Sequence, residues 1–317
     1  MRLLLCLAVG CLMAAPASAV VLDGSIAGDG YTLAATQTVD TQFGDATPNG
    51  GSELDAAWAQ ISGGVLYVTL TGNLENNFNK LNVFIDSVAG GENVVTNNTG
   101  NGGNNPSNDN WAAKYAGFTF DASFAADYLL ILRNGNAGGD RFDVDFNSVG
   151  NTSVVELSSS IFGGSLTGSN ANVGSSSLGV AFDRSNTAGV VGGTGAANQA
   201  AAQAVQTGVE LAIPLAAIGN PGAGGVIKIS AMINGSNHDY LSNQFLGGLP
   251  AGQGNLGGDG AGNFNGTVGQ LNLNNPNYAD GIQYFSVRIP IPEPSSLALL
   301  GLSLASISCG WRQRAKQ

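Results

Sequence analysis

The sequence predicts an all-β protein: an antiparallel β-sandwich with one short Ala-rich helix, long loops rich in Gly and Asn, and a C-terminal hydrophobic helix. Three observations predict it. Short segments alternate apolar and polar residues with a period of two, which is typical of half-buried strands. Gly, at 48 of 317 residues, and abundant Asn separate these segments. Apolar residues still make up 43% of the chain, which favours a packed core over disorder.

The clearest alternation is residues 142–146, where Phe, Val and Phe alternate with Asp143 and Asp145. This pattern places one row of side chains in a core and the other in water. The predicted strands are residues 31–39, 54–61, 65–71, 80–86, 118–120, 128–133, 142–146, 153–157, 178–182, 209–213, 227–233 and 285–289.

One segment departs from this period. Residues 196–206 are built of Ala, Gln and one Asn before Val205, with Thr194 as a candidate N-cap and Gly208 as a candidate C′ residue. The sequence therefore predicts one short helix there. Residues 90–110, 167–177 and 247–277 are predicted to be long loops, which in compact domains are functional or mobile.

The first residues read as a secretory signal peptide. Arg2 is followed by an apolar stretch at residues 3–13, and Ala17 and Ala19 form a small-residue cleavage site. The mature chain is predicted to begin at Val20. Export through the Sec translocon and cleavage by signal peptidase follow as expected steps.

The last residues combine a short motif, an apolar run and a basic end. Pro292, Glu293 and Pro294 precede apolar residues 297–311, and the tail carries three cations. These are Arg312, Arg314 and Lys316. A hydrophobic segment followed by basic residues keeps its basic end in the cytoplasm, so the rest of the chain lies outside.

This tail resembles the PEP-CTERM sorting signal. The resemblance implies handling by an exosortase-type membrane protease in bacteria that build an extracellular matrix. An uncut single-pass anchor is the alternative interpretation. The expected organisation is a signal peptide at residues 1–19, one β-sandwich domain at residues 20–290, and a sorting or anchor segment at residues 291–317.

Composition excludes several classes of function. Without Arg2, Glu293 and the basic tail, residues 20–292 carry 7 Lys or Arg against 21 Asp or Glu, so their charge is near −14. That charge repels nucleic acid. The three Cys residues all lie in the targeting segments, which excludes thiolate catalysis and Cys-ligated metals in the exported domain.

Asp140, Asp143 and Asp145 are the candidate acidic site. Asp143 and Asp145 share one strand face, about 6.5 to 7 Å apart between Cα atoms. Three interpretations stay open: a solvated strand face, a calcium site completed by Asp140, or a carboxylate pair of the glycoside hydrolase type. The pair lacks an environment that would separate its two pKa values, as acid–base catalysis requires.

Trp111 and Tyr115 are the candidate carbohydrate contacts. Trp111 closes the Asn-rich loop, either as an exposed platform for sugar stacking or as a buried anchor of the loop. Residues 54–86 and 209–219 are similar to family-nine-like carbohydrate-binding modules and related DOMON sandwiches. No binding residue of those families can be transferred to a position here.

The predicted function is that of an exported, non-catalytic structural or adhesive protein, sorted to the cell envelope, cell surface or matrix and binding extracellular polysaccharide. Its anchor is transient or permanent, depending on processing. A secreted carbohydrate-active enzyme is the alternative. Calcium is the only cofactor that the composition suggests, through its excess of carboxylates.

Overall fold

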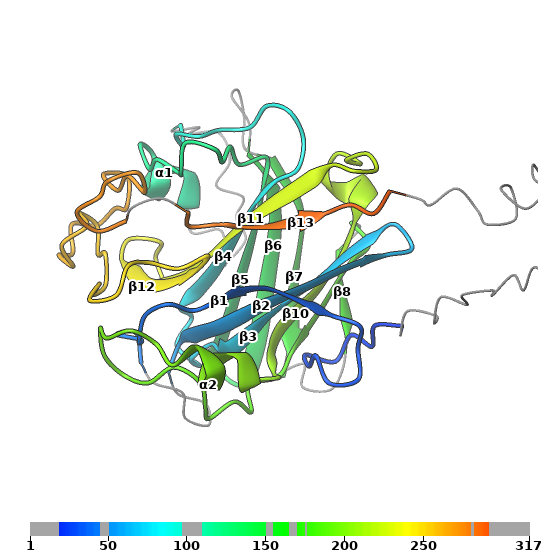
Figure 1. Cartoon of the computed structure of the whole chain (residues 1–317), viewed down its shortest axis with the longest axis horizontal. Helices are drawn as coiled ribbons and strands as arrows, with labels where there is room; N and C mark the ends of the chain where they lie inside the picture. Colours follow the sequence, from blue (N-terminus) through cyan, green and yellow to red (C-terminus); the bar gives the residue numbers. More distant parts are fainter. Residues whose placement is uncertain are drawn as a thin grey trace, which may run out of the picture.

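Two antiparallel sheets face each other and form a sandwich (Figure 1), which confirms the predicted fold class. The computed structural model describes residues 19–44, 51–96, 110–149, 155–164, 170–174, 176–279 and 282–291. The predicted C-terminal helix lies outside these residues. Among the helices that are described, none has the length and apolarity needed to cross a bilayer.

The first sheet has six strands. In spatial order they are β1 (Thr32–Thr36), β2 (Glu53–Ser62), β3 (Val65–Asn73), β10 (Gly208–Pro214), β9 (Leu178–Phe182) and β8 (Ala171–Val173). β1 pairs only with β2, so it forms one edge of this sheet.

The second sheet has seven strands. In spatial order they are β12 (Leu241–Leu246), β11 (Val226–Asn234), β4 (Lys80–Asp86), β5 (Tyr128–Asn136), β6 (Asp140–Ser148) and β7 (Val155–Gly163), with β13 (Phe285–Arg288) also paired to β11. β12 pairs with the Ala231–Asn234 half of β11, and β13 pairs with the Val226–Ile229 half. β13 is therefore an edge strand that completes this sheet.

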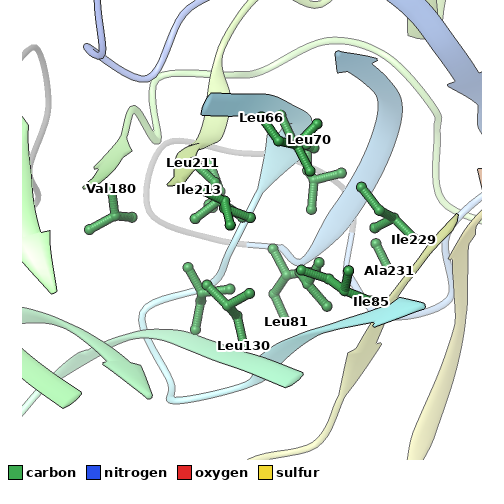
Figure 2. Packing of buried hydrophobic residues seen from close by; sticks show 14 of the residues in the cluster. Leu66, Leu70, Leu81, Ile85, Leu130, Val180, Leu211, Ile213, Ile229 and Ala231 are labelled. Carbon is green, nitrogen blue, oxygen red and sulfur yellow. The ribbon is translucent and has the colours of Figure 1, made fainter. Parts of the chain in front are cut away.

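The main core fills the space between the sheets. Its side chains come from the inward rows of both sheets, as the period-two pattern requires. Figure 2 shows Leu66 and Leu211 of the first sheet opposite Leu81 and Leu130 of the second. Burial of these rows away from water is the main contribution to the stability of the sandwich.

A second core covers the outer face of the seven-stranded sheet. Two excursions of the chain, described at residues 87–96 and 110–127 and at residues 247–279 and 282–284, pack aromatic and aliphatic side chains against Phe84, Ile131 and Met232. Backbone hydrogen bonds join the two excursions, including Thr119 N to Leu271 O and Leu273 N to Thr119 O. The predicted loops 90–110 and 247–277 are thus, where described, a packed layer.

The described residues also form three short helices: α1 (Trp111–Tyr115), α2 (Gln199–Ala204) and the 3-10 helix η1 (Leu215–Ile218). α2 confirms the predicted Ala-rich helix but begins later than expected. Its N-cap is Asn198, whose side chain accepts a hydrogen bond from Ala201 N, and Gly208 belongs to β10.

One predicted strand is not formed as a strand, and two observed strands were not predicted. Residues 118–120 form isolated bridges through Thr119, while Phe118 and Phe120 point into the second core. β8 is too short for its periodicity to be visible, and β12 was missed because its central residues, Ser242 to Gln244, are polar although buried. A strand buried on both faces does not alternate.

Candidate functional site

A groove opens where the two sheets meet at their β1 and β13 edges. It has a volume of 330 Å³, at the lower end of the range for ligand sites. Among the described strands, β1 and β13 each pair on one side only, so these two edges border the groove without being hydrogen-bonded to each other. Its principal lining residues are Thr32, Leu33, Gln60, Ile61, Ser286 and Arg288.

Gln60, one of the lining residues, carries an unsatisfied hydrogen-bond donor. Its Nε2 atom is buried and makes no hydrogen bond to any other described residue. On the same face of β2, two residues away, the indole Nε1 of the half-buried Trp58 likewise has no partner among the described residues. Buried donors without partners are rare in folded proteins, because desolvation is then uncompensated.

Arg288 supplies the only charge in the groove. Its guanidinium is exposed and Nη1 donates a 3.2 Å hydrogen bond to Gly224 O, which fixes its position. In the described part of the chain, no carboxylate pairs with it. The lining residues include neither a carboxylate nor an imidazole. The groove therefore offers hydrogen-bond donors and an aliphatic wall, but no general acid or base.

The prediction that residues 143 and 145 lie on a solvated strand face is wrong. Asp143 and Asp145 are both fully buried, because the outer face of β6 is covered. The carboxylate of Asp143 accepts 2.6 and 2.9 Å hydrogen bonds from Arg141 and a 2.7 Å bond from Arg133. Two arginines thus neutralise it.

Asp140 is held elsewhere, in a 2.6 Å ion pair with Arg184. This hydrogen bond, together with the charge of Arg184, lowers the pKa of Asp140. In the described residues, no three His, Cys, Asp or Glu side chains gather closely enough to hold a metal ion. Calcium binding by Asp140, Asp143 and Asp145 stays a prediction, and these contacts engage Asp140 and Asp143 in ion pairs.

Trp111 and Tyr115 are both fully buried in the second core, on α1. Phe84 packs against both rings in edge contacts, with centroids 6.3 and 5.4 Å away. The prediction that Trp111 is an exposed stacking platform is therefore wrong, because its ring is buried in the second core. No described aromatic of α1 is available to a sugar.

Tyr115 also belongs to a buried polar network. Its hydroxyl donates to Asn82 Oδ1 at 3.2 Å and accepts from Asn234 Nδ2 at 3.0 Å. Burial raises the pKa of Tyr115. The Asn82 amide nitrogen lies 3.4 Å from Nδ1 of His238, which is also fully buried. These contacts connect α1 and the 235–239 turn to the sheet.

Both ends of the described chain lie on one side of the molecule (right in Figure 1). Ala19, of the predicted cleavage site, is exposed, and Ile291 is 69% exposed. Ala17, Pro292, Glu293, Pro294 and the cations Arg312, Arg314 and Lys316 lie outside the described residues. The groove wall β13 ends three residues before Ile291.

Sequence reasoning missed Gln60 and Arg288 entirely. They lie near opposite ends of the exported domain, and only the pairing of β1 with β2 and of β13 with β11 brings them to one groove. An alternation pattern assigns a residue to a face, but it does not say which edges meet.

No curated protein and no solved structure matches this chain. The similarity to carbohydrate-binding sandwiches is therefore not shown by these comparisons. One family model does match, the PEP-CTERM protein-sorting motif, and it covers residues 290–314. The chain therefore carries a PEP-CTERM sorting signal, which indicates a protein exported by the Sec route, anchored by that signal and processed by exosortase.

Proposed function

We propose that the exported domain is a non-catalytic structural or adhesive protein of the cell surface or matrix, and that it binds extracellular polysaccharide in the β1–β13 groove. The observation that carries the proposal is the buried amide donor of Gln60, a lining residue of the groove, which has no partner in the part of the chain that the structure describes. A ligand oxygen would satisfy it.

The chemistry of the groove suits a sugar chain. Pyranose rings present hydroxyl oxygens at their rims and C–H groups on their faces. Gln60 and Arg288 supply donors for the oxygens, while Leu33 and Ile61 supply aliphatic contact for the faces. The groove is partly open to solvent, so we propose that a segment of the polymer enters it from the side.

Two features support a binding role over catalysis. Glycoside hydrolysis normally uses two carboxyl groups beside the scissile bond, whereas the groove lining has none. The predicted pair is buried on the outer face of β6, and Asp143 is held by Arg133 and Arg141. No observation favours the alternative of a carbohydrate-active enzyme.

A groove-blocking variant tests the proposal. Ser286 is exposed and lines the groove, so Ser286→Trp fills it. Ser62→Trp, at the exposed end of β2 and outside the lining, is the matched control. The measurement is retardation in affinity gels containing dextran, xylan, alginate or the polysaccharide purified from the matrix of producing cells.

We expect the parent protein and Ser62→Trp to be retarded by at least one of these polymers, and Ser286→Trp to migrate freely. Gln60→Ala should weaken retardation, because the unsatisfied donor is removed. Equal retardation of the parent and Ser286→Trp would place binding elsewhere. Free migration of the parent in every gel would reject polysaccharide binding.

A further inference from the structure

Arg288 differs from the other cations of the exported domain in how its charge is compensated. Residues 20–292 carry 7 Lys or Arg against 21 Asp or Glu, so carboxylates are abundant. Five of these cations form ion pairs with carboxylates: Lys114, Arg133, Arg141, Arg184 and Lys228. Lys80 is fully buried. Arg288 is exposed, lines the groove and has no carboxylate partner among the described residues.

The strand register explains why Arg288 is left without an acid. Its cross-strand partner on β11 is the aliphatic Val226, and Ser286, two residues earlier on the same face of β13, is uncharged. Ser286 is opposite Lys228, whose ammonium is already paired with Asp86 at 3.2 Å. The positive charge of Arg288 is therefore not neutralised by the strands that carry it.

Asp29 is the acid that immediately precedes a lining residue, Gly30. It does not itself line the groove, and its Oδ1 accepts a 3.1 Å hydrogen bond from Val21 N. The negative charge of the domain thus acts on a bound ligand from beyond the lining, and exposed charges are screened over roughly 8 Å at physiological ionic strength. A direct contact with Arg288 is screened much less.

The hydrogen-bonding groups of the groove favour an acceptor that carries no hydrogen of its own. Nη1 of Arg288 donates to Gly224 O, and the other guanidinium N–H groups have no partner in the described part of the chain. A sugar hydroxyl both donates and accepts, whereas an ionised carboxylate only accepts. The planar guanidinium can also bind both oxygens of a carboxylate through two parallel hydrogen bonds.

We propose that the polymer bound in the groove is acidic: a polysaccharide whose uronic acid units place a carboxylate against Arg288. This inference rests on the proposed polysaccharide binding and narrows its class of ligand. Leu33 and Ile61 supply the contact with the sugar ring, and the guanidinium selects the charged unit. The evidence for this selection is charge complementarity at a lining residue of an otherwise uncharged groove.

The test compares two polymers that differ in charge at the same positions. Affinity gels contain alginate, a polymer of uronic acids, or its propylene glycol ester, in which the carboxylates are masked. The proteins are the full chain in a non-ionic detergent and its variants Arg288→Gln and Arg288→Lys. The matched control is Lys114→Gln, because Lys114 is a partly exposed cation that is paired with Asp239 and does not line the groove.

We expect the parent protein to bind alginate about tenfold or more tightly than the ester, since a charge-assisted hydrogen bond is lost with the carboxylate. Arg288→Gln should lose this preference and retain its affinity for the ester, which also shows that the groove is intact. Arg288→Lys should keep part of the preference, because it retains the charge without the planar fork. Lys114→Gln should behave as the parent does.

Equal affinity of the parent for alginate and its ester, or an unchanged preference in Arg288→Gln, would overturn the acidic ligand. Loss of ester binding in Arg288→Gln would also overturn it, by assigning Arg288 to the shape of the groove. In each of these cases, retardation that Ser286→Trp abolishes would leave polysaccharide binding in the groove intact. Free migration of the parent with every polymer, dextran and xylan included, would reject both proposals.

Discussion

Arg133 on β5 and Asp143 on β6 are direct cross-strand partners, and their side chains form a 2.7 Å ion pair that is almost completely buried. The row continues across the sheet, because Arg133 is also opposite Lys80, and Lys80 is opposite Asn234. Four neighbouring strands thus carry a polar row on a face that is covered, not solvated.

Removing one partner of this pair should be strongly destabilising. Arg133→Met keeps the length of the side chain but withdraws a charge from the buried carboxylate, which Arg141 alone must then neutralise. We expect the free energy of unfolding to fall by about 2 to 4 kcal/mol, measured by urea denaturation. The partly exposed pair of Lys228 and Asp86 is the control, and Asp86→Asn should cost less than about 1 kcal/mol. Equal losses of unfolding free energy in Arg133→Met and Asp86→Asn would contradict the burial of the Arg133–Asp143 pair.

Trp111→Ala should act on stability and not on sugar retention. Because the ring is buried against Phe84 and Tyr115, its removal leaves a cavity and should cost about 3 to 5 kcal/mol. Phe264, which is 66% exposed, provides the control, since Phe264→Ala should change stability by less than about 0.5 kcal/mol. Thermal unfolding and affinity-gel retardation of the folded variant are the two measurements. Selective loss of retardation without destabilisation would restore the stacking role.

Asp121 should give the domain a pH-dependent stability. Burial raises its pKa to about 6, against the lowering effect of a 2.6 Å hydrogen bond from Gln283 N. The folded state therefore binds this proton more tightly than the unfolded state, whose Asp pKa is about 3.9. Stability from this group is complete below about pH 4 and is lost as the pH rises to about 6.

Asp121→Asn removes that loss, so the variant should be more stable than the parent by about 1 to 2 kcal/mol at pH 7, with the difference vanishing near pH 4.

Asp259→Asn should show the opposite dependence of stability on pH. Hydrogen bonds from Asn263 and Ala261 lower the pKa of Asp259, so its carboxylate stabilises the fold above its unfolded pKa, and that stability disappears only in more acidic solution. Urea denaturation from pH 3.5 to 8 measures the difference in stability between each variant and the parent. The same pH dependence in both variants would refute the assigned directions of the two pKa shifts.

Glu210 binds the N-terminal segment, at residues 23, 24 and 31, to the six-stranded sheet. Its carboxylate accepts a 2.5 Å hydrogen bond from the Tyr31 hydroxyl and 2.8 Å bonds from the backbone nitrogens of Asp23 and Gly24. Burial raises the pKa of Glu210, opposed by these three bonds. We expect Glu210→Ala to cost about 1 to 3 kcal/mol and to accelerate amide hydrogen exchange at Asp23 and Gly24.

The matched control for this segment is Glu75→Ala. Glu75 is a partly exposed glutamate that bonds the side chain of Asn77, so its removal should leave exchange at residues 23 and 24 unchanged. Unaltered exchange in Glu210→Ala would mean that packing alone holds the segment.

β13 should be required for stability while the sorting tail is not. Phe285 is 4% exposed and belongs to the main core, so Phe285→Ala should cost about 3 to 4 kcal/mol. Its exposed neighbour is the control, because Ser286→Ala should cost less than about 0.5 kcal/mol. A chain ending at Ile291 should unfold at the same urea concentration as the full chain. A large drop on truncation would show that the tail itself supports the fold.

The sequence by itself determined the fold class of the protein and its sorting signal. Alternation along residues 80–86 and 209–213 places Leu81 and Leu211 in the core, as observed, because a strand with one inward face needs apolar residues at every second position. The sorting signal is carried by neighbouring residues of the chain, so the sequence alone is enough to find it.

The tertiary structure decided which faces are covered and which edges meet. Asp143 and Asp145 alternate with core residues as if solvated, yet both are fully buried, and Arg133 and Arg141 hold the Asp143 carboxylate. The groove joins Gln60 to Arg288 only through the pairing of β1 and β13 with separate sheets. A period of two distinguishes the two sides of a strand, whereas burial of the second side and contact between edges depend on residues far away in the chain.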